Sequence, residues 1–184
     1  MSTLKWVAAC VLSLAPALLY AQGYGFGREA SAKEIAGWNI DVTPDGKGLP
    51  KGSGSVAQGK QVYDSMCAAC HGAKGEGKPA DRLVGGRGSL NTGKPVKTIG
   101  SFWPYATTIF DYVNRAMPYT APQSLTPDQV YAVTAYLLNL NGIVGADAVM
   151  SAETLPKVQM PNRAGFVGDP RPDTANVPCV TACK

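Results

Sequence analysis

Cys67-Ala68-Ala69-Cys70-His71 is the stretch that decides the fold of this chain. Two cysteines separated by two residues and followed at once by histidine form the attachment signature of a c-type haem. The thiols can add to the two vinyl groups of the porphyrin, and the next residue then lies where its imidazole can bind the iron. A small disulfide or half of a zinc site is the alternative interpretation. Zinc would need two further ligands at workable spacing, and nothing near the motif supplies such a pair.

His71 is the only histidine among the 184 residues. Bis-histidine ligation within the chain, a second haem with its own histidine and a histidine general base are therefore excluded. The distal ligand must be a thioether, another weak donor, or nothing. Met117 is the main candidate, because it ends a helix-like run and Pro118 stiffens the loop that would carry the sulfur. Met160, which also precedes a proline, is the rival, and filling a gap in the core is the ordinary role of any methionine.

The N-terminus has the pattern of a secretory signal peptide. Lys5 precedes an apolar stretch from Trp6 to Tyr20, and the small residue Ala21 precedes Gln22, so cleavage is expected after position 21. The remaining chain would then be periplasmic, in the oxidising compartment that haem attachment needs. The apolar stretch is too short to be a convincing membrane anchor, which takes about 20 residues. No membrane span is expected after cleavage.

The apolar periodicity predicts three helices in the central part of the chain, and Gly- and Pro-rich segments flank them. They are expected at 56–67, at 104–116, and from a capping box at 126–129 to a C-cap at Gly142. A small amphipathic piece is expected at 32–38. We therefore predict an all-α fold with irregular N- and C-terminal arms. The expected divisions are a signal peptide at 1–21, an N-terminal extension at 22–54, a mono-haem domain at 55–142 and a C-terminal wrapping arm at 143–184.

Apolar residues at helical spacing indicate how these helices pack. The first helix is expected to bury Gly59, Val62, Tyr63 and Met66. Gly59 on this helix and Tyr136 on the last one have the sizes expected where two helices cross closely. These residues support the site without taking part in its chemistry.

Cys179 and Cys183 form a second cysteine pair, near the C-terminus. In a helical turn their Cα atoms would lie roughly 6 Å apart, within reach of a disulfide. A local disulfide in the tail is therefore expected. A redox-active pair or a covalent link to a partner is the alternative.

The order of a first helix, Cys-x-x-Cys-His, a long Gly-rich loop, a short helix, Met-Pro and a capped last helix resembles a class I cytochrome c over about residues 55–142. Further segments carry a narrower resemblance over nearly the whole exported chain. They are DVTPDGKGLP at 41–50, RLVGG at 82–86, GSFWPYATT at 100–108, APQSL at 121–125, LNGI at 140–143, MPNR at 160–163 and DPRPD at 169–173. These segments resemble the SoxD-type cytochrome subunit of sulfur (sulfane) or sulfite dehydrogenase.

The resemblance implies roles for individual residues. Cys67 and Cys70 would hold one covalent haem c, and His71 and Met117 would be the axial ligands of its iron. With both axial positions of the iron occupied by side chains, the protein would be an electron carrier without catalytic residues of its own. In that family the cytochrome accepts electrons from a molybdenum-cofactor subunit that oxidises sulfur bound to a carrier protein, so such a subunit is the expected partner. A free-standing diffusible electron-shuttle cytochrome is the alternative, and a haem enzyme would require an open or labile sixth position.

Trp103 and Arg87 are candidates for contacts with the haem propionates, although a core tryptophan and a solvated arginine are the ordinary roles of these residue types. The formal net charge is +4, and basic residues are in excess between positions 55 and 100. A basic rim around a haem edge would steer a small acidic redox partner or a downstream cytochrome. A merely solvated surface is the alternative. No nucleic-acid partner is expected, because the basic residues lack interleaved aromatics and the protein is predicted to be exported.

Overall fold

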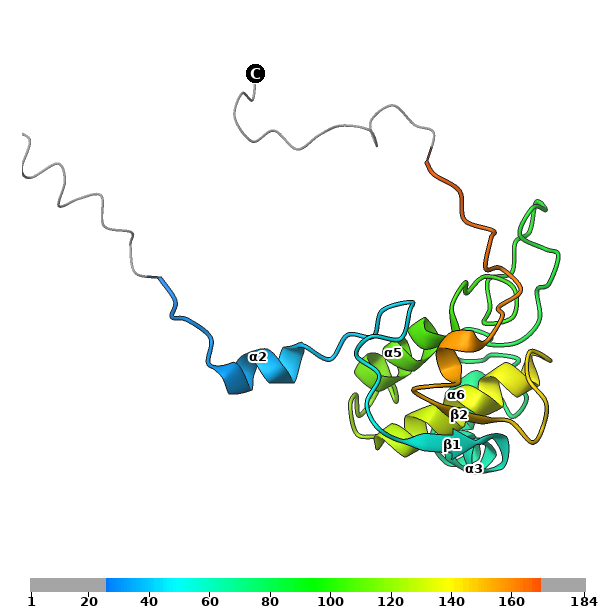
Figure 1. Ribbon diagram of the computed structural model, residues 1–184. Helices are drawn as coiled ribbons and strands as arrows, with labels where there is room; N and C mark the ends of the chain where they lie inside the picture. Colours follow the sequence, from blue (N-terminus) through cyan, green and yellow to red (C-terminus); the bar gives the residue numbers. More distant parts are fainter. Residues whose placement is uncertain (1–25, 170–184) are drawn as a thin grey trace, which may run out of the picture. The chain divides into compact units, whose positions relative to one another are not determined.

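The computed structural model describes residues 26–169, which fall into two compact units with the boundary between Asn39 and Ile40 (Figure 1). The predicted signal peptide and the Cys179–Cys183 pair lie outside the described residues. Within 26–169, no helix combines the length and apolarity that crossing a membrane requires.

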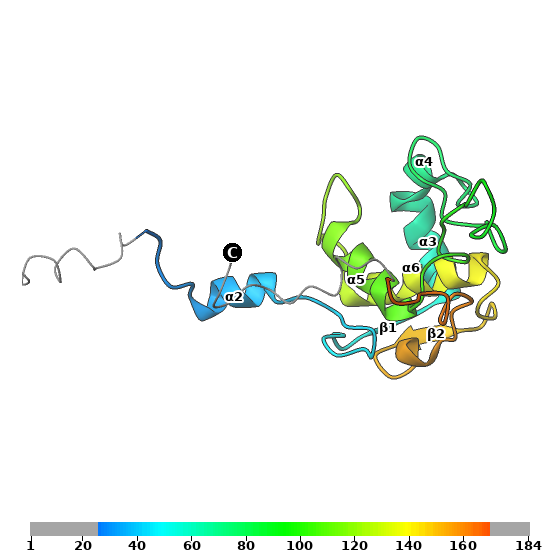
Figure 2. The same ribbon diagram turned by 90° about the horizontal axis from the view of Figure 1, so that it is seen from above.

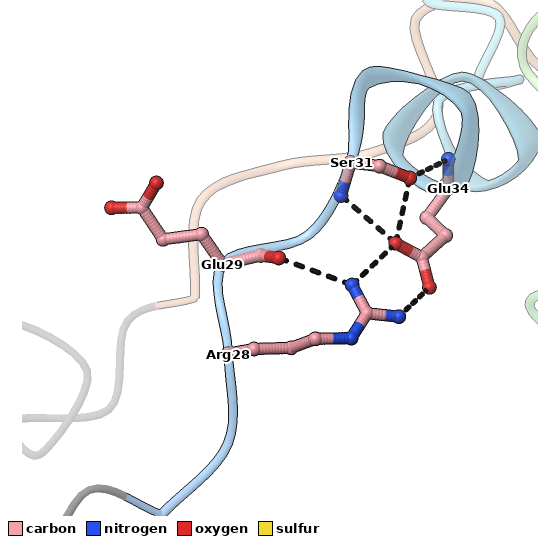
Figure 3. Close-up of polar contacts among 4 residues, drawn as sticks. All are labelled: Arg28, Glu29, Ser31 and Glu34. Carbon is pink, nitrogen blue, oxygen red and sulfur yellow. Dashed lines mark hydrogen bonds and ion pairs between the residues drawn. The ribbon is translucent and has the colours of Figure 1, made fainter.

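The unit that ends at Asn39 contains α2 (Ala32–Trp38), which confirms the helix expected there. Its first turn is closed by a capping box, in which the Glu34 backbone N–H donates to Ser31 Oγ at 3.3 Å and the Glu34 carboxylate accepts from the Ser31 N–H at 2.8 Å (Figure 3). The Arg28 guanidinium donates to the same carboxylate. No residue of α2 is buried, and the side chains of Ile35 and Trp38 are 54% and 86% exposed.

This capping cluster makes α2 sensitive to acid. Hydrogen bonds from Arg28 and then Ser31 lower the pKa of Glu34 from 4.5 to about 2. Because the pKa is lower in the folded state, the cluster stabilises α2 above about pH 4.5, and this stabilisation is lost as the pH falls toward 2. We expect the helical Cα chemical shifts of residues 32–38 to decay over that window. Glu34→Gln keeps a capping side chain but does not titrate, so its helix should show no such decay; equal pH profiles for the two proteins would contradict the prediction.

In the second unit, the first and last helices cross at Gly59, as the sequence predicts. They are α3 (Val56–Met66) and α6 (Pro127–Leu140). A Cβ atom placed on Gly59 would lie 1.8 Å from the carbonyl oxygen of Ala132 and 2.8 Å from Cβ of Tyr136. The rings of Tyr63 and Tyr136 pack beside this crossing, with their centroids 5.3 Å apart. The backbones of α3 and α6 therefore meet without an intervening side chain.

Capping boxes fix the first turns of both helices. Thr126 and Gln129 form the expected capping box of α6, and Ser55 and Gln58 form a second one at the start of α3. The expectation that Met66 is buried on the packing face of α3 is wrong, because its side chain is 45% exposed. Met66 is the last residue of α3, about two turns from the crossing with α6.

A third helix, α5 (Ala106–Ala116), packs against α6 and buries Ile109, Phe110 and Val113. The expected start near 104 is two residues too early. Tyr105 is the N-cap and has an extended backbone, as does the helix C-cap at Met117, where the chain turns away before Pro118. The predicted end of this helix is confirmed.

A small two-stranded sheet, which the sequence analysis does not predict, adds to the mainly helical fold. Strands β1 (Ser53–Ser55) and β2 (Val149–Ser151) pair antiparallel, with Gly54 opposite Met150, and the sheet packs on α6 (Figures 1 and 2). A Cβ atom on Gly54 would lie 2.3 Å from the backbone nitrogen of Ala132, so β1 lies directly on the helix. Strands of three residues are too short for an alternating pattern to be recognised in the sequence.

The chain after α6 contributes side chains to the core of this unit. The 3-10 helix η1 (Leu155–Lys157) follows β2. Met150, Leu155 and Met160 are all buried and belong to the same hydrophobic cluster as Phe110 and Tyr131. Residues 149–160 therefore stabilise the helices around the site.

Candidate haem site

The Cys-x-x-Cys-His motif forms one turn of helix directly after α3. This turn is α4 (Ala68–His71), and the His71 backbone N–H donates to the carbonyl of Cys67 at 3.0 Å. Both cysteine thiols are free, so the disulfide alternative is not realised. Burial raises the pKa of the Cys67 thiol to about 11, and the neighbouring Cys70 adds to the shift. Within residues 26–169 no group of three or more His, Cys, Asp or Glu side chains is placed to hold a metal ion.

The imidazole of His71 is oriented by a backbone carbonyl. Its Nδ1 lies 2.8 Å from the carbonyl oxygen of Asp81. A carbonyl oxygen only accepts, so Nδ1 carries the proton and Nε2 keeps its lone pair for a metal. The loop that brings Asp81 here is fixed by hydrogen bonds from Gly77 N to His71 O (2.8 Å) and from Ala80 N to Cys70 O (2.9 Å). This contact could not be predicted from the sequence, because every residue has a backbone carbonyl and residue type therefore gives no signal.

Met117 stands where α5 ends. Its backbone N–H donates to the carbonyl of Val113 at 3.1 Å, and the chain then leaves the helix. The side chain is half-buried and packs against the core. In the view of Figure 2, α4 and the loop after α5 rise on the same side of α6. The rival Met160 is buried in the core, the ordinary role of a methionine.

Side chains of the motif, of the loops after it and of the end of α5 border the hydrophobic core while remaining partly exposed. They are Cys67, Ala68, Leu83, Trp103 and Met117. Partly exposed apolar groups of this kind are available for contact with an apolar macrocycle. With two free thiols, an imidazole nitrogen available to a metal and a thioether, the residues present fit a covalently attached haem.

Comparison with known proteins identifies the family of the chain. The cytochrome c family model matches residues 56–141, the part that runs from α3 through the motif and Met117 to α6. The crystal structure of the sulfane dehydrogenase SoxCD from Paracoccus pantotrophus is similar, with a TM-score of 0.75 and 46% sequence identity, over 88% of this chain and 83% of that chain. This chain belongs to the cytochrome c family. The predicted class I cytochrome c fold is confirmed, and membership implies covalently bound haem c and electron transfer.

A thiosulfate dehydrogenase from Stutzerimonas stutzeri (strain A1501) is a more distant relative of this cytochrome. The two are 30% identical over 93 residues, which is 48% of this chain and 28% of that protein. The cytochrome therefore spans less than a third of the length of this relative.

Trp103 and Arg87 of the cytochrome both have protein partners. The Trp103 ring packs edge-on against Tyr112, with centroids 5.8 Å apart. Arg87 is exposed, and its Nη2 donates to the carbonyl of Asn141 at 2.8 Å, beside an open cavity of about 370 Å³. Contacts of either residue with haem propionates stay a prediction.

The basic side chains that form the predicted rim are all exposed. They are Lys60, Lys74, Lys78, Arg82, Arg87, Lys94 and Lys97. Two of them make contacts with other side chains. Lys60 forms an ion pair with Asp64, and the Lys97 ammonium lies 5.0 Å from the centroid of the Phe102 ring. Lys74, Lys78 and Arg82 belong to the loop that supplies the Asp81 carbonyl to His71, which places positive charge next to the motif.

Proposed function

We propose that this cytochrome is the electron-accepting subunit of a periplasmic dehydrogenase that oxidises a sulfur compound, sulfane sulfur or sulfite. One haem c would be held by Cys67 and Cys70, with His71 and Met117 as axial ligands. The observation that carries the proposal is the 46% identity with the sulfane dehydrogenase structure over 88% of this chain. That similarity reaches well beyond residues 56–141, which a general cytochrome c match covers. The arms are thus part of the resemblance.

The geometry of the site suits single-electron transfer. A haem iron held between histidine and methionine supplies a reversible one-electron couple. The hydrogen bond from Nδ1 of His71 to the Asp81 carbonyl fixes the tautomer and strengthens Nε2 as a donor. A Met117 thioether bound to the iron would favour the reduced state and raise the potential. Side chains in both axial positions would leave substrate no place to bind on the iron, and this ligation would suit an electron-transfer subunit better than a haem enzyme.

The N-terminal arm supports a lasting complex over a free shuttle. Ile35 and Trp38 lie three residues apart on α2 and expose most of their apolar surface. Large exposed apolar side chains gathered on one element are typical of protein interaction sites. A diffusible shuttle needs only the haem region, so the partner we propose is a molybdenum-cofactor dehydrogenase subunit that binds these arms.

The direct test mixes the oxidised holoprotein with the purified molybdenum-cofactor subunit of the same source. Size-exclusion chromatography reports complex formation, and absorbance reports haem reduction after addition of sulfite or of a carrier protein bearing sulfane sulfur. Co-elution together with substrate-dependent reduction is expected. Reduction without co-elution would favour the diffusible shuttle, and absence of both would overturn the proposal.

The basic loop beside the motif should affect association with an acidic redox partner. Charge reversal in Lys74→Glu/Lys78→Glu is expected to slow the second-order electron-transfer rate about tenfold at low salt, because steering by complementary charge is lost. At about 1 M salt, where the Debye length is about 3 Å, the two rates should converge. Stopped-flow absorbance measures both. Lys51→Glu/Lys157→Glu reverses two exposed lysines outside both the loop and α2 and so makes the same change in net charge; an equal effect from it would assign the result to net charge alone.

A further inference from the structure

Helix α5 carries a polar stripe on the side that meets the N-terminal segment. Thr107, Asp111 and Arg115 recur every four residues and therefore share one face of the helix. Thr107 and Asp111 are 1% and 8% exposed. These two buried polar side chains need partners, since an unpaired buried polar group is costly.

Their partners belong to residues 41–50, which we call the strap. Thr107 Oγ1 donates to the carbonyl of Pro44 at 3.0 Å, and the backbone N–H of Val42 donates to Asp111 Oδ1 at 2.9 Å. Val42 is itself buried. A residue 69 positions away in the sequence is thus hydrogen-bonded directly to α5.

The same carboxylate also holds the end of α5. Arg115 Nε donates to both oxygens of Asp111 at 3.1 Å, and Arg115 Nη2 donates to Oδ2 at 2.5 Å. Planar guanidinium–carboxylate pairing of this kind is charge-assisted and restricts orientation as well as distance. Asp111 therefore joins the strap to the last turn of the helix.

That last turn leads directly into the distal ligand. Met117 follows Arg115 by two residues and makes the final hydrogen bond of the helix, to Val113. Helix ends fray readily, and the chain beyond Met117 becomes exposed, with Tyr119 84% exposed. The Asp111 contacts act at the point where the helix would otherwise loosen.

We propose that Asp111 is a positioning residue for the distal haem ligand, which it acts on by clamping the last turn of α5 to the strap. The inference rests on the ligation by His71 and Met117 set out above. With Met117 as the iron ligand, an external ligand would have to displace the thioether and move this turn. Weakening the clamp therefore lowers the cost of displacement, whereas a purely structural role would change stability and leave ligand exchange unaffected.

The test is an imidazole titration of the ferric, full-length holoprotein, followed by the near-infrared sulfur-to-iron band. Asp111→Ala is expected to bind imidazole about tenfold more tightly than wild type, because it removes charge-assisted hydrogen bonds that hold the closed position. Asp111→Asn keeps an oxygen that can accept from Val42 N–H but loses the charge pair with Arg115, so an intermediate affinity is expected. An intermediate imidazole affinity in Asp111→Asn would show that Asp111 acts by positioning the last turn of α5.

Two control variants separate positioning from general effects. Met150→Ala creates a cavity in the core at β2 and lowers stability without touching the end of α5. Asp64→Asn removes the i,i+4 ion pair with Lys60 on α3, which has the same spacing as the Asp111–Arg115 pair. Both are expected to keep the wild-type affinity for imidazole.

Wild-type affinity in Asp111→Ala, or an equal gain in Met150→Ala, would overturn the inference. If Asp111→Ala does not fold, Arg115→Gln decides, because it changes a half-exposed residue, removes the charge pair at the last turn and leaves the Val42–Asp111 hydrogen bond in place. A gain of about threefold is expected for it, and no gain would count against the clamp. Absence of the sulfur-to-iron band from the wild type would overturn the methionine ligation itself, and the clamp with it, while leaving the dehydrogenase partnership to the co-elution test.

Discussion

Met117→Ala is expected to abolish the near-infrared sulfur-to-iron band, to make the ferrous protein bind carbon monoxide, and to lower the reduction potential by on the order of 0.1 V. The thioether favours ferrous over ferric iron, and axial ligands set haem potentials over a range of about 0.8 V, so loss of one ligand shifts the potential by a measurable part of that range. Absorbance spectroscopy and a potentiometric titration measure all three effects.

Met160→Ala is the matched control for this substitution. Met160 also precedes a proline, but its side chain is buried in the core rather than half-buried at the end of α5. The variant should lose about 2–5 kcal/mol of stability, as buried methionines do when truncated to alanine, and should keep the band and the potential. A band that survives in Met117→Ala, or disappears in Met160→Ala, would show that the ligand assignment is wrong.

Gly59→Ala is expected to destabilise the holoprotein by about 3 kcal/mol, although it adds a single methyl group. The new Cβ atom would lie 1.8 Å from the carbonyl oxygen of Ala132, far inside van der Waals contact. The obstacle is backbone rather than the end of a flexible side chain, so relief requires α3 and α6 to separate. Guanidinium chloride unfolding, followed by far-ultraviolet circular dichroism, measures the loss.

Gly93→Ala serves as the control, because a Cβ atom on Gly93 meets nothing within 4 Å. This change should leave the unfolding midpoint unchanged or raise it slightly, since alanine restricts the unfolded chain. If Gly59→Ala unfolded at the same denaturant concentration as Gly93→Ala, the close crossing of the two helices would be contradicted.

The sequence is most informative where the chemistry is local. The haem-attachment motif occupies one helical turn, so residue types and spacing are enough to identify it. The capping box of Thr126 and Gln129 acts within a single turn and was predicted correctly. The end of α5 before Pro118 follows from the backbone restriction that proline imposes. The crossing at Gly59 was also predictable, because only a residue without a side chain permits such close approach.

Other parts of the site are created by contacts between distant segments. Residue types and spacing alone were enough to predict the haem motif, the capping box of α6, the end of α5, and His71 and Met117 as the main candidate ligands with Met160 as the rival. Only the tertiary structure decided that the Asp81 carbonyl orients His71, that Val42 is bonded to Asp111, and that β1 pairs with β2. Backbone carbonyls and N–H groups are common to nearly all residues, and three-residue strands carry no period. Such contacts become visible only when the packing of the helices brings the segments together.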